Sequence, residues 1–230
     1  MEICTASDDK TLRIWSIEPK QMSLIRGKVF DKLCRACQFS PNGDLIAIGF
    51  KEGTVSVIKS DTLEEVATVN HRTQEISDLK FSPYTGKYLA VGSHENFIDI
   101  YNVESKKRVG ICKGASSYIT HVEWDNDGKL LMTNSGAKEL LYFEAPKGAR
   151  VNVNADAASK INWSTFTSVL GPTCEGIWQP CMDITDINTT CLSKNGRTLA
   201  TGDDFGLVKL FEYPCTVFFV FFNLLLFFLI

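Results

Sequence analysis

The sequence predicts an all-β fold in which similar four-stranded units repeat along the chain, as in a β-propeller. Four segments align with one another, and the turn glycines Gly43, Gly86 and Gly128 that they share are 43 and 42 residues apart. Within each segment, short apolar strands alternate with turns of the Asn, Asp and Gly type, because these residues tolerate positive φ angles. No stretch of the chain has convincing helical periodicity.

Each aligned segment has the same internal order. An apolar strand ends at Phe-Ser-Pro or a variant of it, and a tight turn leads into a second strand, such as residues 45–49. A further turn leads into an alternating strand, such as residues 54–58, and a more polar strand closes the unit, as expected for residues 64–69. The four segments are FSPNGDLIAIGFKEGTVSVI from Phe39, FSPYTGKYLAVGSHENFIDIY from Phe81, WDNDGKLLMTNSGAKELLYF from Trp124 and LSKNGRTLATGDDFGLVKLF from Leu192.

A fifth, partial copy opens the chain, where TASDDKTLRIW (residues 5–15) matches TGDDFGLVKLF (residues 201–211). This copy resembles the WD40 repeat, with Asp9 in the turn between the second and third strands and Trp15 at the end of the third. The resemblance implies a buried hydrogen-bonded network of Asp9, a strand Ser or Thr, Trp15 and a preceding His, which we expect to lie upstream of Met1. Such partners are needed because burying an isolated carboxylate is costly. In the other copies apolar packing must replace this network, since the Trp position holds Ile58, Tyr101, Phe143 and Phe211.

The copies at the two ends of the chain are shorter than the others. The first begins at the second strand of its unit, and the last ends at its third strand, at Phe211. We therefore expect an incomplete WD40-type β-propeller in residues 1–215, with about three whole blades plus two partial ones and with open edges. An insert of about residues 144–184 separates the last two copies, because Gly196 follows Gly128 by 68 residues.

The apolar C-terminal tail, residues 216–230, is expected to lie outside the fold. Thirteen of the fourteen residues from Val217 onward are apolar, and they do not alternate as a strand with one solvated face would. As a helix they would span about 21 Å, which is short of the hydrocarbon core of about 30 Å. All their codons except that of Asn223 carry U in the middle position, so a translated non-coding stretch is one explanation. Membrane contact through the tail is the alternative, which we do not favour.

Composition and motifs argue against several classes of function. The chain has 24 Lys and Arg against 27 Asp and Glu, a net charge of −3, which disfavours nucleic acid as a partner. No nucleophile elbow, phosphate-binding loop or convincing metal-ligand spacing is present, so we predict no catalytic residue, no metal site and no cofactor. Cys34 and Cys37 are three apart on a predicted strand, where their side chains would face opposite ways. Asp183 and Asp186 could form an acid–base pair, but we favour a structural role for Asp186 at the start of the last blade.

Propellers bind partners through their faces and loops, because the strands are committed to the blades. Segments 144–156 and 171–183 are therefore the candidate partner surface. Within the second segment, Trp178 and Met182 are candidate exposed anchors, since large side chains dominate many interfaces. The alternative, which we favour, is that Trp178 packs over the insert and covers the edges of the blades.

The region from residue 163 to residue 215 carries a long and ordered family resemblance. The matching segments are WSTFT (163–167), VLGP (169–172), GIW (176–178), TDIN (185–188), GDDFG (202–206) and LFEYPC (210–215). With these segments, residues 1–215 resemble the echinoderm microtubule-associated protein-like family of WD-repeat proteins. The matching region resembles the later blades of the second propeller of that family.

The resemblance implies a non-enzymatic protein that associates with tubulin and microtubules, is cytoplasmic and acts in cytoskeleton organisation. Members of the family carry two linked propellers, and some also have an N-terminal coiled coil with a basic region. The alternative is a propeller scaffold for other protein partners, in which microtubule binding has been lost together with the N-terminal region.

Overall fold

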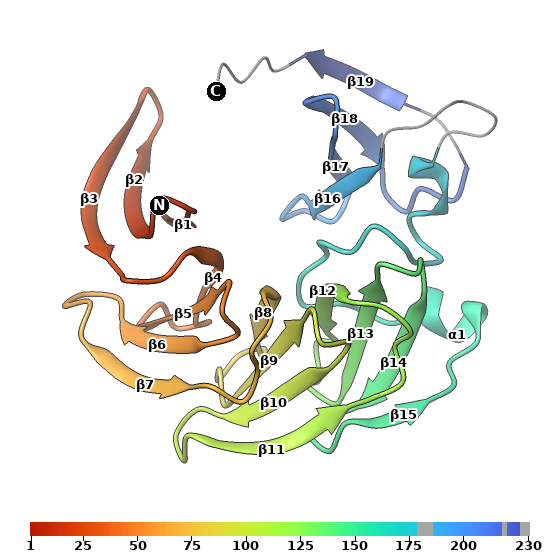
Figure 1. The fold of residues 1–230 in the computed structure, drawn as a ribbon. Helices are drawn as coiled ribbons and strands as arrows, with labels where there is room; N and C mark the ends of the chain where they lie inside the picture. The colour runs from red at the N-terminus through yellow and green to blue at the C-terminus, as the bar shows by residue number, and fades with distance from the viewer. Residues whose placement is uncertain (179–185, 218–219, 226–230) are drawn as a thin grey trace.

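The computed structural model describes all residues except 179–185, 218–219 and 226–230. The described residues form five antiparallel sheets arranged around a common axis (Figure 1), together with one short α-helix and one turn of 3-10 helix. The prediction of an all-β propeller is confirmed. No helix within the described part of the chain is long and apolar enough to cross a membrane.

Each sheet is a blade whose strands follow one another in chain order, from the axis outward. The bounds of the strands are as follows: blade 1 has β1 (Glu2–Ala6), β2 (Thr11–Glu18) and β3 (Gln21–Val29); blade 2 has β4 (Cys34–Phe39), β5 (Leu45–Phe50), β6 (Val55–Lys59) and β7 (Glu65–Val69); blade 3 has β8 (Ile76–Phe81), β9 (Tyr88–Ser93), β10 (Ile98–Asn102) and β11 (Lys107–Cys112); blade 4 has β12 (Ile119–Trp124), β13 (Leu130–Ser135), β14 (Leu140–Glu144) and β15 (Ala149–Val151); blade 5 has β16 (Ile187–Leu192), β17 (Thr198–Asp203), β18 (Leu207–Glu212) and β19 (Val220–Leu225).

The turn between the first two strands of a blade is specified by a few adjacent residues. In blade 2 the backbone N–H of Leu45 donates to the hydroxyl of Ser40 at 2.9 Å, and that hydroxyl donates to Asn42 at 2.7 Å. Gly43 completes the turn with a φ of 80°, a conformation that costs glycine little. Ser193, Asn195 and Gly196 repeat the arrangement in blade 5, so the sequence copies correspond to copies of local structure.

The core lies between neighbouring blades. The four residues at the Trp position of the WD40 pattern, namely Ile58, Tyr101, Phe143 and Phe211, are all buried, with exposed fractions of 5% or less. Burying a side chain of this size contributes about 1.5–3 kcal/mol to the stability of the fold. Apolar packing therefore supports these blades, as the sequence predicts.

The insert between β14 and β16 is more ordered than a polar linker. It begins with β15, the outer strand of blade 4, and continues into helix α1 (Ala155–Ser159), where the side chain of Asn154 accepts the N–H of Ala157 at 2.8 Å. The 3-10 turn η1 (Glu175–Ile177) follows. Apolar residues of the insert, including Phe166 and Ile177, pack with Phe211 in one core cluster. The insert is therefore part of the core that joins blades 4 and 5.

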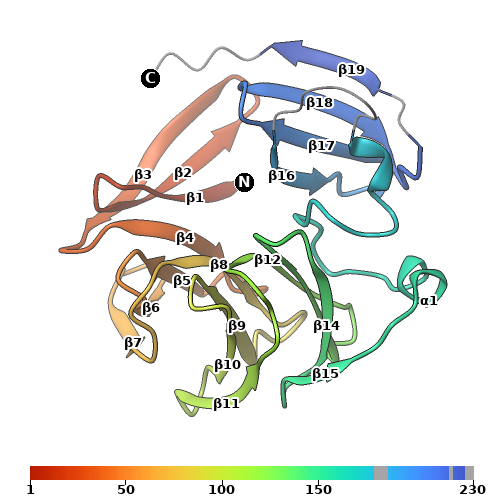
Figure 2. The ribbon, with the colours of Figure 1, turned by 45° about the vertical axis from the view of Figure 1, so that its right-hand side comes forward.

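The C-terminal tail differs from the expectation. From the sequence we expected residues 216–230 to lie outside the fold, whereas the structure pairs Val220–Leu225 with β18 as the outer strand of blade 5 (Figure 2), with Asn223 opposite Lys209. The physical reason is that the outer edge of β18 offers unpaired backbone groups, and hydrogen bonding to this edge requires no alternation of side chains. Val, Phe and Leu also include strong strand formers.

Candidate functional site

The two WD40 positions of blade 1 lie in separate local structures. The indole N–H of Trp15 on β2 donates to the hydroxyl of Thr5 on β1 at 2.9 Å, which joins these two strands of blade 1. Asp9 sits in the β1–β2 turn, where its carboxylate accepts from the N–H and hydroxyl of Thr11 and pairs with Arg13 at 2.6 Å. The hydroxyl of Thr11 is the main reason that the pKa of Asp9 is lowered. Because the Asp9 side chain is 42% exposed, its contacts stabilise a surface turn.

The inner strands are linked from blade to blade by side chains that bind the next blade's backbone. Gln38 on β4 accepts the N–H of Phe81 at 2.6 Å, and Asp78 on β8 accepts the N–H of Val122 at 2.8 Å. Glu123 on β12 continues the series with the insert. These partners are 43 or 44 residues apart, which is one repeat. The bonds join blade 2 to blade 3, blade 3 to blade 4, and blade 4 to the insert.

Three charged residues, Asp78, Lys80 and Glu123, lie beside these links and form a largely buried charged layer. The ammonium group of Lys80 lies 2.6 Å from the Asp78 carboxylate, and Glu123 also acts on it electrostatically. Burial alone would lower the pKa of Lys80, but the two carboxylates outweigh burial and raise it, so this lysine is charged. Glu123 is fully buried and accepts from Thr165 and Thr167 and from the N–H of Ser168. Burial raises the pKa of Glu123, and Lys80 and the threonine donors oppose that rise.

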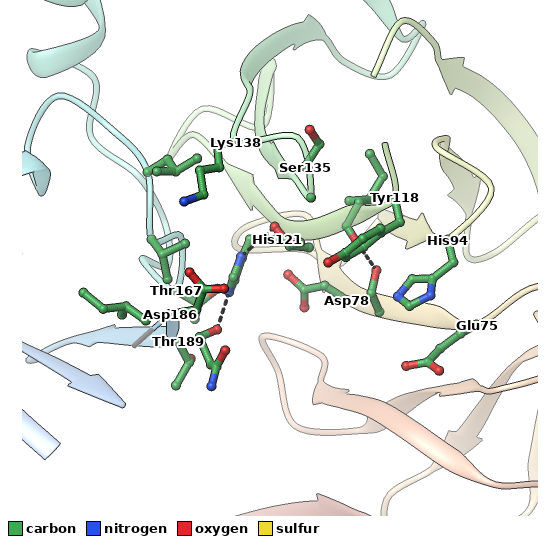
Figure 3. Close-up of a pocket in the computed structure, with 18 of the residues that line it drawn as sticks. Glu75, Asp78, His94, Tyr118, His121, Ser135, Lys138, Thr167, Asp186 and Thr189 are labelled. Carbon is green, nitrogen blue, oxygen red and sulfur yellow. Dashed lines mark hydrogen bonds between the residues drawn. The ribbon is translucent and has the colours of Figure 1, made fainter. Parts of the chain in front are cut away.

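A cavity of about 710 Å³ opens near the axis and is lined by residues from blades 2 to 5. We call it the axial cavity. Figure 3 shows His121 and Asp186 on one side of it and His94, Tyr118 and Glu75 on the other. Its further lining residues are Arg35, Ser77, Asp78, Lys80, Ile119, Thr120, Ser135, Gly136, Lys138, Thr167, Val169, Leu170, Trp178, Ile187, Asn188 and Thr189. Most of these residues come from inner strands and from the loops at one face of the propeller.

Tyr118 lies at the edge of the cavity and makes close contacts on two sides although it is 44% exposed. Its ring lies 4.8 Å from that of His94, measured between centroids. On another side it covers Gly136 so closely that a Cβ atom at that position would be 2.4 Å from a ring carbon. The N–H of Gly136 also donates to the carbonyl of Tyr118 at 2.8 Å. An exposed aromatic ring that is fixed in this way loses little conformational entropy when it contacts a partner.

Trp178 packs over the insert, which is the reading that we favoured from the sequence, and its role as a partner anchor stays a prediction. Its indole N–H donates to the carbonyl of Val169 at 2.9 Å, and its ring packs against the core cluster of the insert. Trp178 is nevertheless only partly buried, it lines the axial cavity, and the ammonium group of Lys138 lies 5.9 Å from its ring centre. Met182, the other candidate anchor, lies outside the described residues.

His121 is tightly engaged within the cavity wall. One ring nitrogen lies 3.1 Å from the carbonyl of Asn188 and the other lies 3.1 Å from the hydroxyl of Thr120. Burial lowers the pKa of His121 below 6.5, so the ring is uncharged at neutral pH. Within the described part of the chain, no group of three or more His, Cys, Asp or Glu residues is placed to hold a metal ion. The arrangement is suited to contacting another molecule through aromatic, charged and hydrogen-bonding groups.

The sequence located part of this site. It singled out Trp178 and Asp186, both of which line the cavity, but it did not identify Tyr118, Lys138 or the charged layer. The available signal was the presence of Asp78, Lys80, His121 and Glu123 within otherwise apolar inner strands at matching repeat positions. Polar residues at such positions can bind the unit that follows in the chain, as Asp78 and Glu123 do here.

The five blades and the axial cavity define the class of protein: a WD-repeat-type β-propeller with a cavity on its loop face. Residues 1–220 match the family model described as the second β-propeller of echinoderm microtubule-associated protein. The chain therefore belongs to the echinoderm microtubule-associated protein-like family.

Curated relatives resemble almost the whole chain. It is 38% identical over 218 residues to human echinoderm microtubule-associated protein-like 2, which covers 93% of this chain and 33% of the relative. It is 37% identical over 218 residues to echinoderm microtubule-associated protein-like 4 of Xenopus laevis, covering 93% of this chain and 23% of that protein. Mouse echinoderm microtubule-associated protein-like 3 is 38% identical over 215 residues, covering 92% and 24%. The chain thus spans a third or less of the length of these relatives.

Proposed function

We propose that the protein is a non-enzymatic, cytoplasmic WD-repeat protein that associates with tubulin or microtubules and acts in cytoskeleton organisation. One observation carries this proposal: the match to the second propeller of echinoderm microtubule-associated protein extends over residues 1–220. The names of the similar proteins give microtubule association to those relatives, and the proposal extends it to this chain. Residues 1–215 are proposed to act as one propeller unit.

Co-sedimentation with assembled microtubules tests this proposal. The full chain is mixed with microtubules at low salt, centrifuged, and quantified in the pellet over a range of microtubule concentrations. Saturable pelleting above the level of a microtubule-free control supports the proposal. Pelleting that does not depend on microtubule concentration, or none at low salt, would sink it. A parallel sample containing detergent separates binding from aggregation driven by the apolar tail.

A second candidate function is a scaffold for other protein partners, with microtubule binding lost in this form. The axial cavity favours it, because Tyr118 is fixed and exposed at a loop face and is not required to complete the core. Affinity capture with the wild-type chain and with Tyr118→Ala distinguishes this function. A partner that is not tubulin, and that is lost with the Ala variant, is the expected result under the second candidate.

A further inference from the structure

The first cluster of charged residues at the axial cavity contains more carboxylates than cations. The guanidinium group of Arg35 contacts Asp8 at 2.9 Å and Glu75 at 2.8 Å. One cation therefore faces two carboxylates at this edge. The arrangement raises the pKa of Arg35, with the hydrogen bond to Glu75 as the largest cause.

The second charged group is deeper and has the same imbalance. Lys80 faces both Asp78 and Glu123, so again one cation faces two carboxylates. Burial raises the pKa of Glu123, and the ion pair between Lys80 and Asp78 has no net charge of its own. The charged groups at the bottom of the cavity therefore have no net positive charge.

Two opposite charges remain at the rim, on Lys138 and Asp186. Both side chains are exposed, and within the described residues neither takes part in a hydrogen bond or an ion pair. Lys138 lies over the ring of Trp178. The carboxylate of Asp186 is therefore available to a visiting cation. With histidines counted as neutral, the lining and its direct ion partners contain more carboxylates than cations.

Aromatic rings complete the site. Tyr118 is fixed by Gly136 and His94, and Trp178 is fixed by its bond to Val169. An aromatic face attracts the positive charge of a Lys or Arg side chain, and the attraction is stronger where water is excluded. Two aromatic rings and a free carboxylate therefore line the same cavity. This combination suits an organic cation better than a simple metal ion, which would need several oxygen ligands.

We propose that the axial cavity is a receptor site for a basic side chain, an arginine or a lysine, presented by a partner polypeptide. The cation enters between Tyr118 and Asp186 and points toward Asp78. Asp186 is the ion-pair partner of the cation, and Tyr118 offers it the face of an aromatic ring. Lys138 repels a second positive charge from the part of the cavity where Trp178 lies. This inference develops the partner-binding role of the proposed function, but it does not require the partner to be tubulin.

The test uses the full chain and three blocked tripeptides. The probes are acetyl-Gly-Arg-Gly-amide, its citrulline analogue, which has the same shape without the charge, and acetyl-Gly-Glu-Gly-amide. Binding is followed by the change in tryptophan fluorescence and by nuclear magnetic resonance shifts. We expect the arginine probe to bind at least about fivefold more tightly than the citrulline probe, and this preference to decrease with added salt. The glutamate probe is expected not to bind.

Matched variants assign the effect to the rim. Asp186→Asn should weaken arginine binding roughly two- to fivefold, whereas Lys138→Gln, an equally exposed change of opposite sign, should strengthen it. Gly136→Ala forces the Tyr118 ring to move and should weaken binding without altering the circular dichroism of the fold. Lys20→Gln, on the exposed β2–β3 turn, is the control and should change nothing.

Several outcomes would overturn the proposal. These are equal binding of the arginine and citrulline probes, no binding of either, or wild-type affinity in Asp186→Asn. The microtubule assay keeps this test separate from the proposed function. A chain that pellets with microtubules but ignores the arginine probe refutes the receptor site alone, whereas the opposite pattern refutes microtubule association alone.

Discussion

Replacing the buried Glu123 with Gln tests whether the inner-strand links stabilise the propeller. The carboxylate has no exposed surface and receives hydrogen bonds from Thr165, Thr167 and Ser168 of the insert. Glutamine has the same shape, but its amide group presents donors where the insert also presents donors. The substitution therefore leaves at least one buried donor unpaired and removes a negative charge from beside Lys80.

The magnitude follows from the number of bonds affected. A hydrogen bond to a charged group contributes about 1.5–3 kcal/mol, and leaving a buried donor unsatisfied costs about 1–3 kcal/mol. Relief from burying a charge offsets part of this loss. We expect Glu123→Gln to lower the free energy of unfolding by about 2–4 kcal/mol. Urea unfolding at pH 7, followed by circular dichroism, measures the change.

Glu139→Gln is the matched control. Glu139 also accepts several hydrogen bonds, from the N–H and hydroxyl of Ser116 and from the hydroxyl of Ser135, but it lies at the surface of the β13–β14 turn. Solvent can replace these bonds, so we expect a loss below about 1 kcal/mol. A Glu123→Gln variant within about 0.5 kcal/mol of the wild type, or a control that loses as much, would refute the reasoning.

Three further predictions concern other parts of the fold. Burial lowers the folded-state pKa of His121 below its unfolded value of 6.5. The stability that the uncharged ring contributes is therefore fully present above pH 6.5 and is lost as the pH falls toward the folded pKa. His121→Gln should remove this pH dependence from thermal melts recorded between pH 7 and pH 5. Thr5→Val should lower the free energy of unfolding in urea by about 0.5–1.5 kcal/mol, because it removes the acceptor of the Trp15 indole N–H. A loss of stability at least as large in Trp15→Phe would support this explanation, and no loss in either variant would contradict it. Arg72→Met should lower the free energy of unfolding by about 3–5 kcal/mol, because Arg72 donates two hydrogen bonds to the carboxylate of Asp99, whose side chain is 1% exposed. Adding Asp99→Asn to the Arg72→Met variant should recover part of this loss.

The repeating fold could be predicted because its information is local. Ser40, Asn42 and Gly43 specify a turn within four residues, and the same residue types recur at the turn of blade 5. Because apolar strands alternate with such turns at a regular period, the sequence favours a series of propeller blades. The family resemblance agreed with this prediction, and the match over residues 1–220 confirms it.

The site could be predicted only in part, because its contacts connect residues far apart in the sequence. Asp78 binds the backbone of Val122, which is 44 residues away, and nothing adjacent to Asp78 indicates this partner. Tyr118 is fixed by Gly136, a glycine that the sequence alone would assign simply to a turn. Strand β19 was missed for a different reason, since a strand that pairs through its backbone needs no alternating pattern.

The most direct test of the central claim is to observe the labelled full chain on surface-attached microtubules by fluorescence microscopy. Binding density is measured against protein concentration at several salt concentrations, with free tubulin added as a competitor. Microtubule association predicts a saturable signal along the lattice that free tubulin or excess unlabelled chain reduces. A signal no greater than on the bare surface, or one that unlabelled chain cannot displace, would contradict it.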